Sequence, residues 1–209
     1  MINNITVNTQ SSIRIDCGSA VIRIDPFGIT GEPHDADIIF ITHDHYDHFS
    51  PEDIGKVRKA DTVFAAPAGM KKKLAGIGAD NAVLLSPGEN CEIAGFPVEA
   101  VAAYNTLKPF HPRSNGWLGY IITAGGKRIY AAGDTDAVKE ARAVKCDIAL
   151  VPVGGTFTMN CKEAAKLVNE IRPGIAVPIH YGSIVGNRTD GEDFGKLVDD
   201  GIRVELKLP

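Results

Sequence analysis

The chain has 209 residues, of which 44% are hydrophobic, and a formal net charge of −4. Its length is sufficient for one substantial core, so we expect a single domain over residues 1–209. Acidic residues (26) outnumber basic residues (22), which disfavours nucleic acid as a partner. No apolar run reaches the roughly 18 residues that a membrane span needs, and residues 1–5 do not resemble a secretory signal. We therefore expect no membrane partner and a cytoplasmic location.

Apolar residues in rough alternation with polar ones predict strands through the first half of the chain. The expected strands span residues 4–7, 12–16, 20–25, 36–41, 62–65 and 82–85. Ser50 is a favourable N-cap and Pro51 suits the first helical position, so a helix is expected over residues 51–59. A second helix is expected over residues 67–74.

The second half begins with strands and ends with strands and helices in alternation. Residues 89–103 predict two paired strands, and residues 117–123 and 127–132 predict a hairpin. The polar loop of residues 104–116 is longer than most connections, and such loops are often functional. Further strands are expected at residues 147–151, 175–178 and 203–206, and helices at 161–171 and 191–198. This order predicts an α/β fold in which two sheets pack face to face and are covered by helices.

The four cysteines are widely spaced and form no Cys-x-x-Cys pair. This spacing indicates neither a thiolate zinc site nor a redox dithiol. We expect buried free thiols at Cys17, Cys91, Cys146 and Cys161.

Three of the six histidines lie between residues 43 and 48, directly after an apolar run of strand character. A tight loop at the end of a buried strand lets these side chains converge on one point. Imidazole nitrogens and a carboxylate oxygen suit zinc, and also iron or manganese. The sequence therefore predicts a site for one or two divalent metal ions, preferably zinc, with ligands from His43, His45, Asp47 and His48.

The pattern His43-x-His45-x-Asp47-His48 after an apolar strand resembles the signature of the metallo-β-lactamase superfamily. Further similar motifs are Asp25-Pro26-Phe27, Gly133-Asp134-Thr135, residues 153–159 and residues 178–182. Together they are most similar to a branch of small hydrolases related to ascorbate-6-phosphate lactonase. The resemblance implies a four-layer αβ/βα sandwich of two mixed sheets, with a metal site at one edge.

The resemblance also implies how the ligands are shared. His43 and His45 would serve one metal ion, whereas Asp47 and His48 would serve the other. Asp134 would bridge the two ions, and His180 would complete the second site. Asp47 could also orient the attacking water, and it is the expected catalytic residue.

One position departs from the family pattern. Asn105 stands where the family has a further histidine ligand of the first metal, and a carboxamide oxygen is a weak ligand for zinc. Three alternatives follow: His111 supplies the missing ligand, the first metal binds loosely through Asn105 or water, or only the second site is filled.

Candidate substrate-binding residues are Arg113 and Trp117, in and after the long loop, and Tyr181, which follows His180. The resemblance also places Thr158 and Met159 near the site. An arginine and aromatic residues beside a metal pair could bind an anionic or ring-bearing small molecule.

These features favour a metal-dependent hydrolase that uses a metal-bound hydroxide on an ester, lactone or phosphodiester bond of a small-molecule substrate. The alternative is a non-catalytic metal-binding or ligand-sensing module of the same fold, which lost its first metal site at Asn105.

Overall fold

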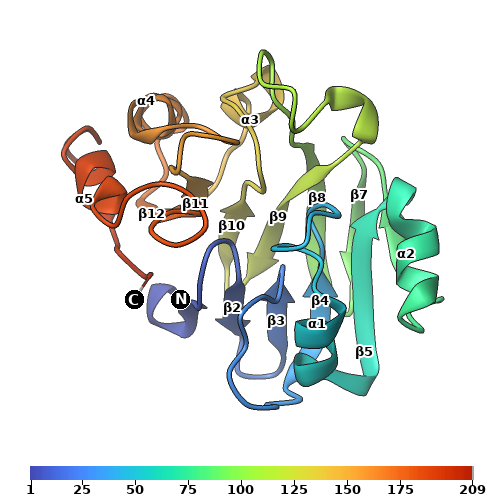
Figure 1. Cartoon of the computed structure of the whole chain (residues 1–209). Helices are drawn as coiled ribbons and strands as arrows, with labels where there is room; N and C mark the ends of the chain where they lie inside the picture. The colour runs from blue at the N-terminus through green and yellow to red at the C-terminus, as the bar shows by residue number, and fades with distance from the viewer. Residues whose placement is uncertain (209) are drawn as a thin grey trace.

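The computed structural model describes residues 1–208 and contains two β-sheets packed face to face (Figure 1). In this described part, the first sheet has six strands in the order β1-β2-β3-β4-β5-β6. Strands β1, β2 and β3 are antiparallel neighbours, whereas β3 to β6 are parallel, so the sheet is mixed. The bounds are β1 (Ile5–Val7), β2 (Ile13–Asp16), β3 (Val21–Ile24), β4 (Ala36–Phe40), β5 (Arg58–Pro67) and β6 (Val83–Leu85).

The second sheet is also mixed and has seven strands within residues 1–208, in the order β13-β12-β11-β10-β9-β8-β7. Strands β7 to β10 run antiparallel to their neighbours, and β10 to β13 run parallel. The bounds are β7 (Asn90–Ile93), β8 (Phe96–Ala102), β9 (Leu118–Ala124), β10 (Lys127–Ala131), β11 (Ile148–Pro152), β12 (Ile175–Ile179) and β13 (Arg203–Val204).

The alternation of side chains along the strands divides the apolar residues among three cores. In β4, Ile38 and Phe40 face the core between the sheets, whereas Ile39 faces the helices outside the first sheet. In β11, Leu150 faces the shared core and Val151 the helices outside the second sheet. Both faces of the central strands are therefore buried, which explains their nearly continuous apolar sequences.

Helices form the two outer layers (Figure 1). Helices α1 (Pro51–Val57) and α2 (Lys71–Gly76) cover the first sheet, and residues of both belong to its outer core. The second sheet is covered by α3 (Lys139–Arg142), α4 (Cys161–Ile171) and α5 (Asp190–Gly195). This arrangement confirms the predicted four-layer sandwich of two mixed sheets. Of the helices described, none has the length and apolar character that crossing a bilayer requires.

Several element boundaries differ from those predicted. The helix expected over residues 67–74 begins only at Lys71, because β5 continues to Pro67 and a 3-10 turn, Ala68–Met70, follows it. The first helix ends at Val57, since the chain passes directly into β5. The helix expected over residues 191–198 ends at Gly195, and the last strand is only Arg203–Val204. Helix α3 was not expected, because its four residues are too few to show a helical period.

Candidate metal centre

The residues 43–48 meet three later loops at one edge of the sandwich. They follow β4, whereas His111 lies in the loop after β8, Asp134 follows β10, and His180 follows β12. The carboxyl ends of strands that run in the same direction open at the same edge, where α/β proteins place their ligands. Segments that are far apart in the sequence therefore contribute to one site.

Hydrogen bonds between the two sheets hold this edge together. The backbone N of Leu118 donates to Thr42 O at 3.1 Å, and the Tyr120 hydroxyl donates to Ile41 O at 2.7 Å. Leu118 and Tyr120 belong to β9 of the second sheet, whereas residues 41 and 42 follow β4 of the first. The histidine loop is thus fixed at its start relative to both sheets.

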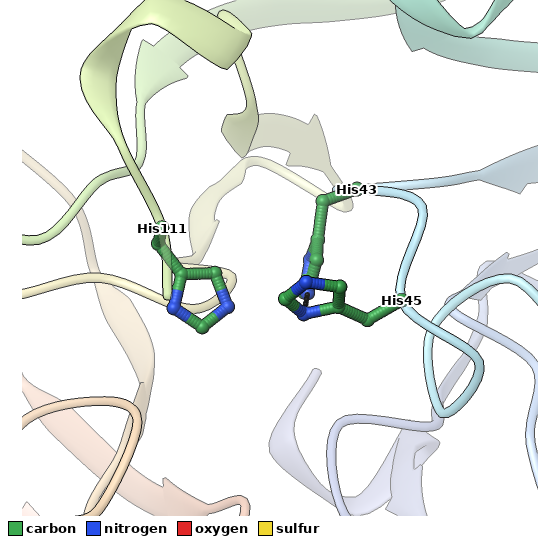
Figure 2. Close-up of side chains that lie close together, drawn as sticks. All are labelled: His43, His45 and His111. Atoms are coloured by element: carbon green, nitrogen blue, oxygen red, sulfur yellow. Dashed lines mark hydrogen bonds between the residues drawn. The ribbon is translucent and has the colours of Figure 1, made fainter. Parts of the chain in front are cut away.

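His43, His45 and His111 form what we call the three-histidine group (Figure 2). Their ligand atoms all lie within 4.8 Å of one another, and His43 Nε2 is 3.1 Å from His45 Nδ1. Figure 2 shows the imidazole of His111 directed from its own loop toward the other two. Among the alternatives for the third ligand of the first site, the geometry favours His111.

Asn105 contacts His111 on the side that faces away from His43 and His45. Its Nδ2 is 3.3 Å from His111 Nδ1, and it donates to Phe157 O at 2.8 Å. The backbone N of Asn105 also donates to His111 O at 2.7 Å. Asn105 therefore contacts the nitrogen of His111 that faces away from the group, and it holds the ring in place.

Asp47, His48 and His180 form a second group, called the Asp47 group below, whose ligand atoms also lie within 4.8 Å of one another. The Nε2 atoms of His48 and His180 are 3.6 and 3.4 Å from Asp47 Oδ2. His180 has a φ of 58°, which is rare for a residue other than glycine. Its backbone N donates to Gln10 O at 3.0 Å. Such strained residues are often found at functional sites.

Asp134 lies between the two groups. Its Oδ2 is 3.3 Å from His111 Nε2 and 3.3 Å from His180 Nε2, and its Oδ1 is 3.4 Å from His48 Nε2. His43 Nε2 is farther away, at 4.0 Å from Oδ2. The two oxygens of one carboxylate thus reach histidines of both groups.

Burial and neighbouring charges set the protonation of these side chains. Burial lowers the pKa of His43 well below its ordinary value, and the nearby His48 lowers it further, so His43 is neutral. Burial by itself raises the pKa of Asp134, but the positive charges of His180 and His48 outweigh it and hold that pKa well below the ordinary value. Burial by itself lowers the pKa of His48, but the carboxylates of Asp134 and Asp25 outweigh it and raise that pKa well above the ordinary value. His43 and Asp134 are therefore in the protonation states that bind a cation, whereas a cation at His48 would displace a proton.

Several nitrogen and oxygen atoms at the centre are buried without a hydrogen-bond partner among the described residues. They are His48 Nε2, His111 Nε2, His180 Nε2 and Asp134 Oδ1. Leaving a buried polar atom unpaired costs about 1–3 kcal/mol, and native proteins rarely do so. These atoms point toward one another, so one or two bound cations would satisfy all of them. The residues present therefore fit the predicted metal ions.

Asp25 and Thr42 support the centre from behind, and the sequence reasoning gave them no role. Asp25 is fully buried and accepts hydrogen bonds from Thr42 N at 2.8 Å and from Thr42 Oγ1 at 2.5 Å. Thr42 Oγ1 also lies 3.0 Å from His43 Nδ1. The available signal was the Asp25-Pro26-Phe27 motif, which places a carboxylate directly after a buried strand.

The predicted substrate-binding residues do not line the cavity over the centre. That cavity has a volume of about 350 Å³ and is bordered by the metal-ligand candidates His45, Asp47, His111, Asp134 and His180. Trp117 packs behind the three-histidine group, with its ring 4.9 Å from the rings of both His43 and His45. Arg113 pairs with Glu140 at 3.1 Å on the surface. Each of these side chains is already engaged elsewhere.

Tyr181, Thr158 and Met159 are also outside the cavity. Tyr181 and Met159 belong to the core beneath α4 and α5, and Thr158 is fully buried. Four side chains without an assigned role line the cavity instead, namely Tyr46, Phe110, Phe157 and Ile184. The sequence alone did not single them out, since Leu107 in the same loop as Phe110 is 95% exposed and does not line the cavity.

Comparison with known proteins agrees with the fold. Residues 4–180 match the family model of the beta-lactamase superfamily domain, so the resemblance of the motifs to the metallo-β-lactamase superfamily is confirmed. A UPF0173 metal-dependent hydrolase from Pyrococcus abyssi is 34% identical, over 92% of this chain and 91% of its own length. The chain belongs to this family of UPF0173 metal-dependent hydrolases.

Solved structures show the same fold. A candidate metal-dependent hydrolase from Parabacteroides distasonis has 35% sequence identity and a TM-score of 0.81, covering 97% of this chain and 91% of that one. Igni18, a metallo hydrolase from the archaeon Ignicoccus hospitalis, has 23% identity and a TM-score of 0.78, with 97% and 94% covered.

Proposed function

We propose that this chain hydrolyses a small-molecule substrate with two divalent metal ions held side by side at the edge of the sandwich. The three-histidine group would hold the first ion and the Asp47 group the second, with Asp134 shared between them. The observation that carries this proposal is the set of unpaired buried atoms on His48, His111, His180 and Asp134. We treat residues 1–209 as a single domain, in keeping with the core that both sheets share.

The ligand chemistry favours zinc. Imidazole and carboxylate ligands without a thiolate suit zinc, and they also suit manganese or iron. When bound, such ions would supply a hydroxide near neutral pH and polarise the bond that is cleaved, in an ester, a lactone or a phosphodiester.

Asp47 is the proposed catalytic residue. It borders the cavity, and its pKa lies below the ordinary value: burial raises the pKa, but the nearby imidazole of His180 and the charge of His48 outweigh the burial. The carboxylate is therefore ionised and can accept a hydrogen bond from the attacking water, which it would orient toward the substrate.

The test compares His45→Ala and Asp134→Ala with the wild type, all purified without chelators. We expect less bound metal, measured by elemental analysis, and a parallel loss of hydrolysis of generic esters and phosphodiesters. Asp44→Asn is the matched control, since Asp44 lies within the same motif but pairs with Lys73 at 2.6 Å. Wild-type metal content in both variants would refute the proposed ligands.

The rival, a non-catalytic binding module, rested on the loss of a first-site ligand at Asn105. The grouping of His111 with His43 and His45 supports a third histidine ligand for the first ion, which weakens that reason. Two bound metal ions without turnover on any ester, lactone or phosphodiester would favour the rival.

A further inference from the structure

The cavity over the metal centre has a polar floor and an apolar mouth. The floor consists of the metal-ligand candidates described above. The mouth is formed by four side chains from separate loops: Tyr46, Phe110, Phe157 and Ile184. Tyr46 follows β4, Phe110 follows β8, Phe157 follows β11, and Ile184 follows β12. These side chains therefore border the same cavity as the metal-ligand candidates.

These apolar side chains are exposed to solvent to an unusual extent. Tyr46 is 64% exposed, Phe110 44% and Ile184 40%. Phe110 and Phe157 meet edge to face, with ring centroids 4.6 Å apart. Water contact with so much apolar surface is unfavourable, and an apolar group placed in the mouth would remove it. The mouth is therefore built for the apolar part of a ligand.

Cationic side chains are missing from the same cavity. Among residues 1–208, neither a lysine nor an arginine lines it. In the adjacent loops, Lys108 pairs with Asp136 and donates to Thr158 O, and Arg113 pairs with Glu140. Arg188, in the loop that carries Ile184, lines a different cavity with Tyr181 and Ser183. A phosphoryl or carboxylate group outside the metal centre would meet no charged donor there, whereas sites for such groups use arginine or lysine.

We propose that the substrate is an uncharged carboxylic ester or lactone with an apolar acyl or alkyl group that occupies the mouth. This inference rests on the proposed hydrolase function and narrows it, since it excludes phosphodiesters and anionic esters. In the reaction, the water oxygen bonds to the carbonyl carbon and the bond from that carbon to the alcohol oxygen breaks. The alcohol leaves with one proton, and the acid releases the other to solvent.

The kinetic test uses the metal-loaded protein and matched p-nitrophenyl esters. From acetate to butyrate to hexanoate, we expect kcat/KM to rise about threefold for each added methylene. The hemisuccinate ester has the chain length of butyrate, with a carboxylate in place of the terminal methyl group. We expect it to be at least about tenfold poorer than butyrate, because the mouth offers that charge no partner. The inference would be overturned if kcat/KM did not rise with acyl chain length, or if hemisuccinate were a better substrate than butyrate. It would also be overturned if the acceleration over the uncatalysed rate were larger for bis(p-nitrophenyl) phosphate than for the butyrate ester.

Variants connect the preference to the mouth. Phe110→Ala and Ile184→Ala should flatten the rise with chain length, and Ile184→Lys should shift the preference toward hemisuccinate. Leu107→Ala is the matched control, since Leu107 lies in the same loop as Phe110, is 95% exposed and does not line the cavity. Leu107→Ala must keep the wild-type rise of kcat/KM with acyl chain length. If Phe110→Ala and Ile184→Ala keep this rise as well, the mouth does not bind the substrate.

A binding measurement separates this inference from the function on which it rests. Alkyl hydroxamates are metal ligands that need no turnover, and calorimetry gives their affinity for the metal-loaded protein. We expect hexanohydroxamate to bind more tightly than acetohydroxamate by about threefold per methylene, and Phe110→Ala to remove the gain. If affinity rises with alkyl chain length but no ester is hydrolysed, the proposed hydrolysis is refuted and an apolar ligand is supported. If esters are hydrolysed but affinity does not rise with chain length, this inference is refuted and the hydrolase function stands.

Discussion

Asp25 Oδ2 accepts a hydrogen bond from His48 Nδ1 at 2.7 Å, and both side chains are completely buried. This contact fixes the orientation of the imidazole and directs its Nε2 toward Asp134, 3.4 Å away. Carboxylates that hold a metal-ligating histidine in this way strengthen metal binding. Asp25 is therefore a positioning residue for the proposed second metal ion.

Asp25→Asn should weaken the binding of one metal ion by about 10–100-fold, because the amide keeps the volume but loses the charge that holds His48. Calorimetric titration of the metal-free protein measures this change. Asp44→Asn, which removes a carboxylate from the histidine motif without touching a proposed ligand, should bind both ions normally. Unchanged affinity in Asp25→Asn would show that the hydrogen bond is not needed.

His111→Ala and Asn105→Ala test whether His111 binds the first metal ion and whether Asn105 only positions the imidazole of His111. His111→Ala should bind one metal ion instead of two, since it removes a nitrogen of the three-histidine group. Asn105→Ala should keep both ions but weaken the first by about tenfold, because the ring of His111 loses its neighbour. Elemental analysis and titration together check both results. If Asn105→Ala loses the ion completely and His111→Ala does not, the assignment of the two residues is reversed.

Metal removal should lower the thermal stability. With free metal at a hundred times its Kd, binding to the folded state contributes about 2.7 kcal/mol. For a chain of this size, that corresponds to a Tm difference of about 5–10 °C between the loaded and the chelator-treated protein. Scanning calorimetry measures it. The shift should be much smaller in Asp134→Ala, and an equal shift there would mean that the metal binds elsewhere.

Gly154→Ala should disturb the position of His180. An added Cβ would lie only 2.3 Å from His180 O and 2.8 Å from Val185 Cγ2, so the backbone that carries the histidine must move. We expect a loss of about 1–3 kcal/mol in the free energy of unfolding, measured in urea, and weaker metal binding. Gly55→Ala in α1 is the control, because its Cβ meets no heavy atom within 4 Å. That control should be neutral or stabilising by about 0.5–1 kcal/mol.

The thiol of Cys146 should be unreactive in the folded protein. Burial raises its pKa from 9.0 to about 12, so the thiolate is scarcely present at pH 8. Because the folded pKa lies above the unfolded one, the associated stabilisation is complete below pH 9 and is lost as the pH rises toward 12. Titration with a thiol reagent at pH 8 should leave Cys146 unlabelled until denaturant is added. Rapid labelling of the folded protein would contradict this.

The local patterns of the sequence predicted the strands and the longer helices well. Helix α4 has the expected bounds, and its Asn160 cap and Glu163 form a capping box. Errors occurred where neighbouring elements join, as at Pro67, because the end of a strand depends on pairing with β6 and not on the local sequence. Arg113, Trp117 and Tyr181, which were predicted to bind substrate, do not line the cavity over the centre, because the direction of a side chain depends on tertiary packing. Each residue is close to His111 or His180 in sequence, but its side chain is directed elsewhere.

The sequence by itself determined the fold class and the chemistry of the histidine cluster, because hydrophobic periodicity and ligand types are local properties of the chain. Only the tertiary structure decided that His111 joins His43 and His45, that Asn105 stands behind it, and that the cavity mouth is apolar. These relationships depend on how loops from β4, β8, β10 and β12 meet at one edge of two sheets. Such contacts between distant segments are set by the packing of the shared core, which no local pattern records.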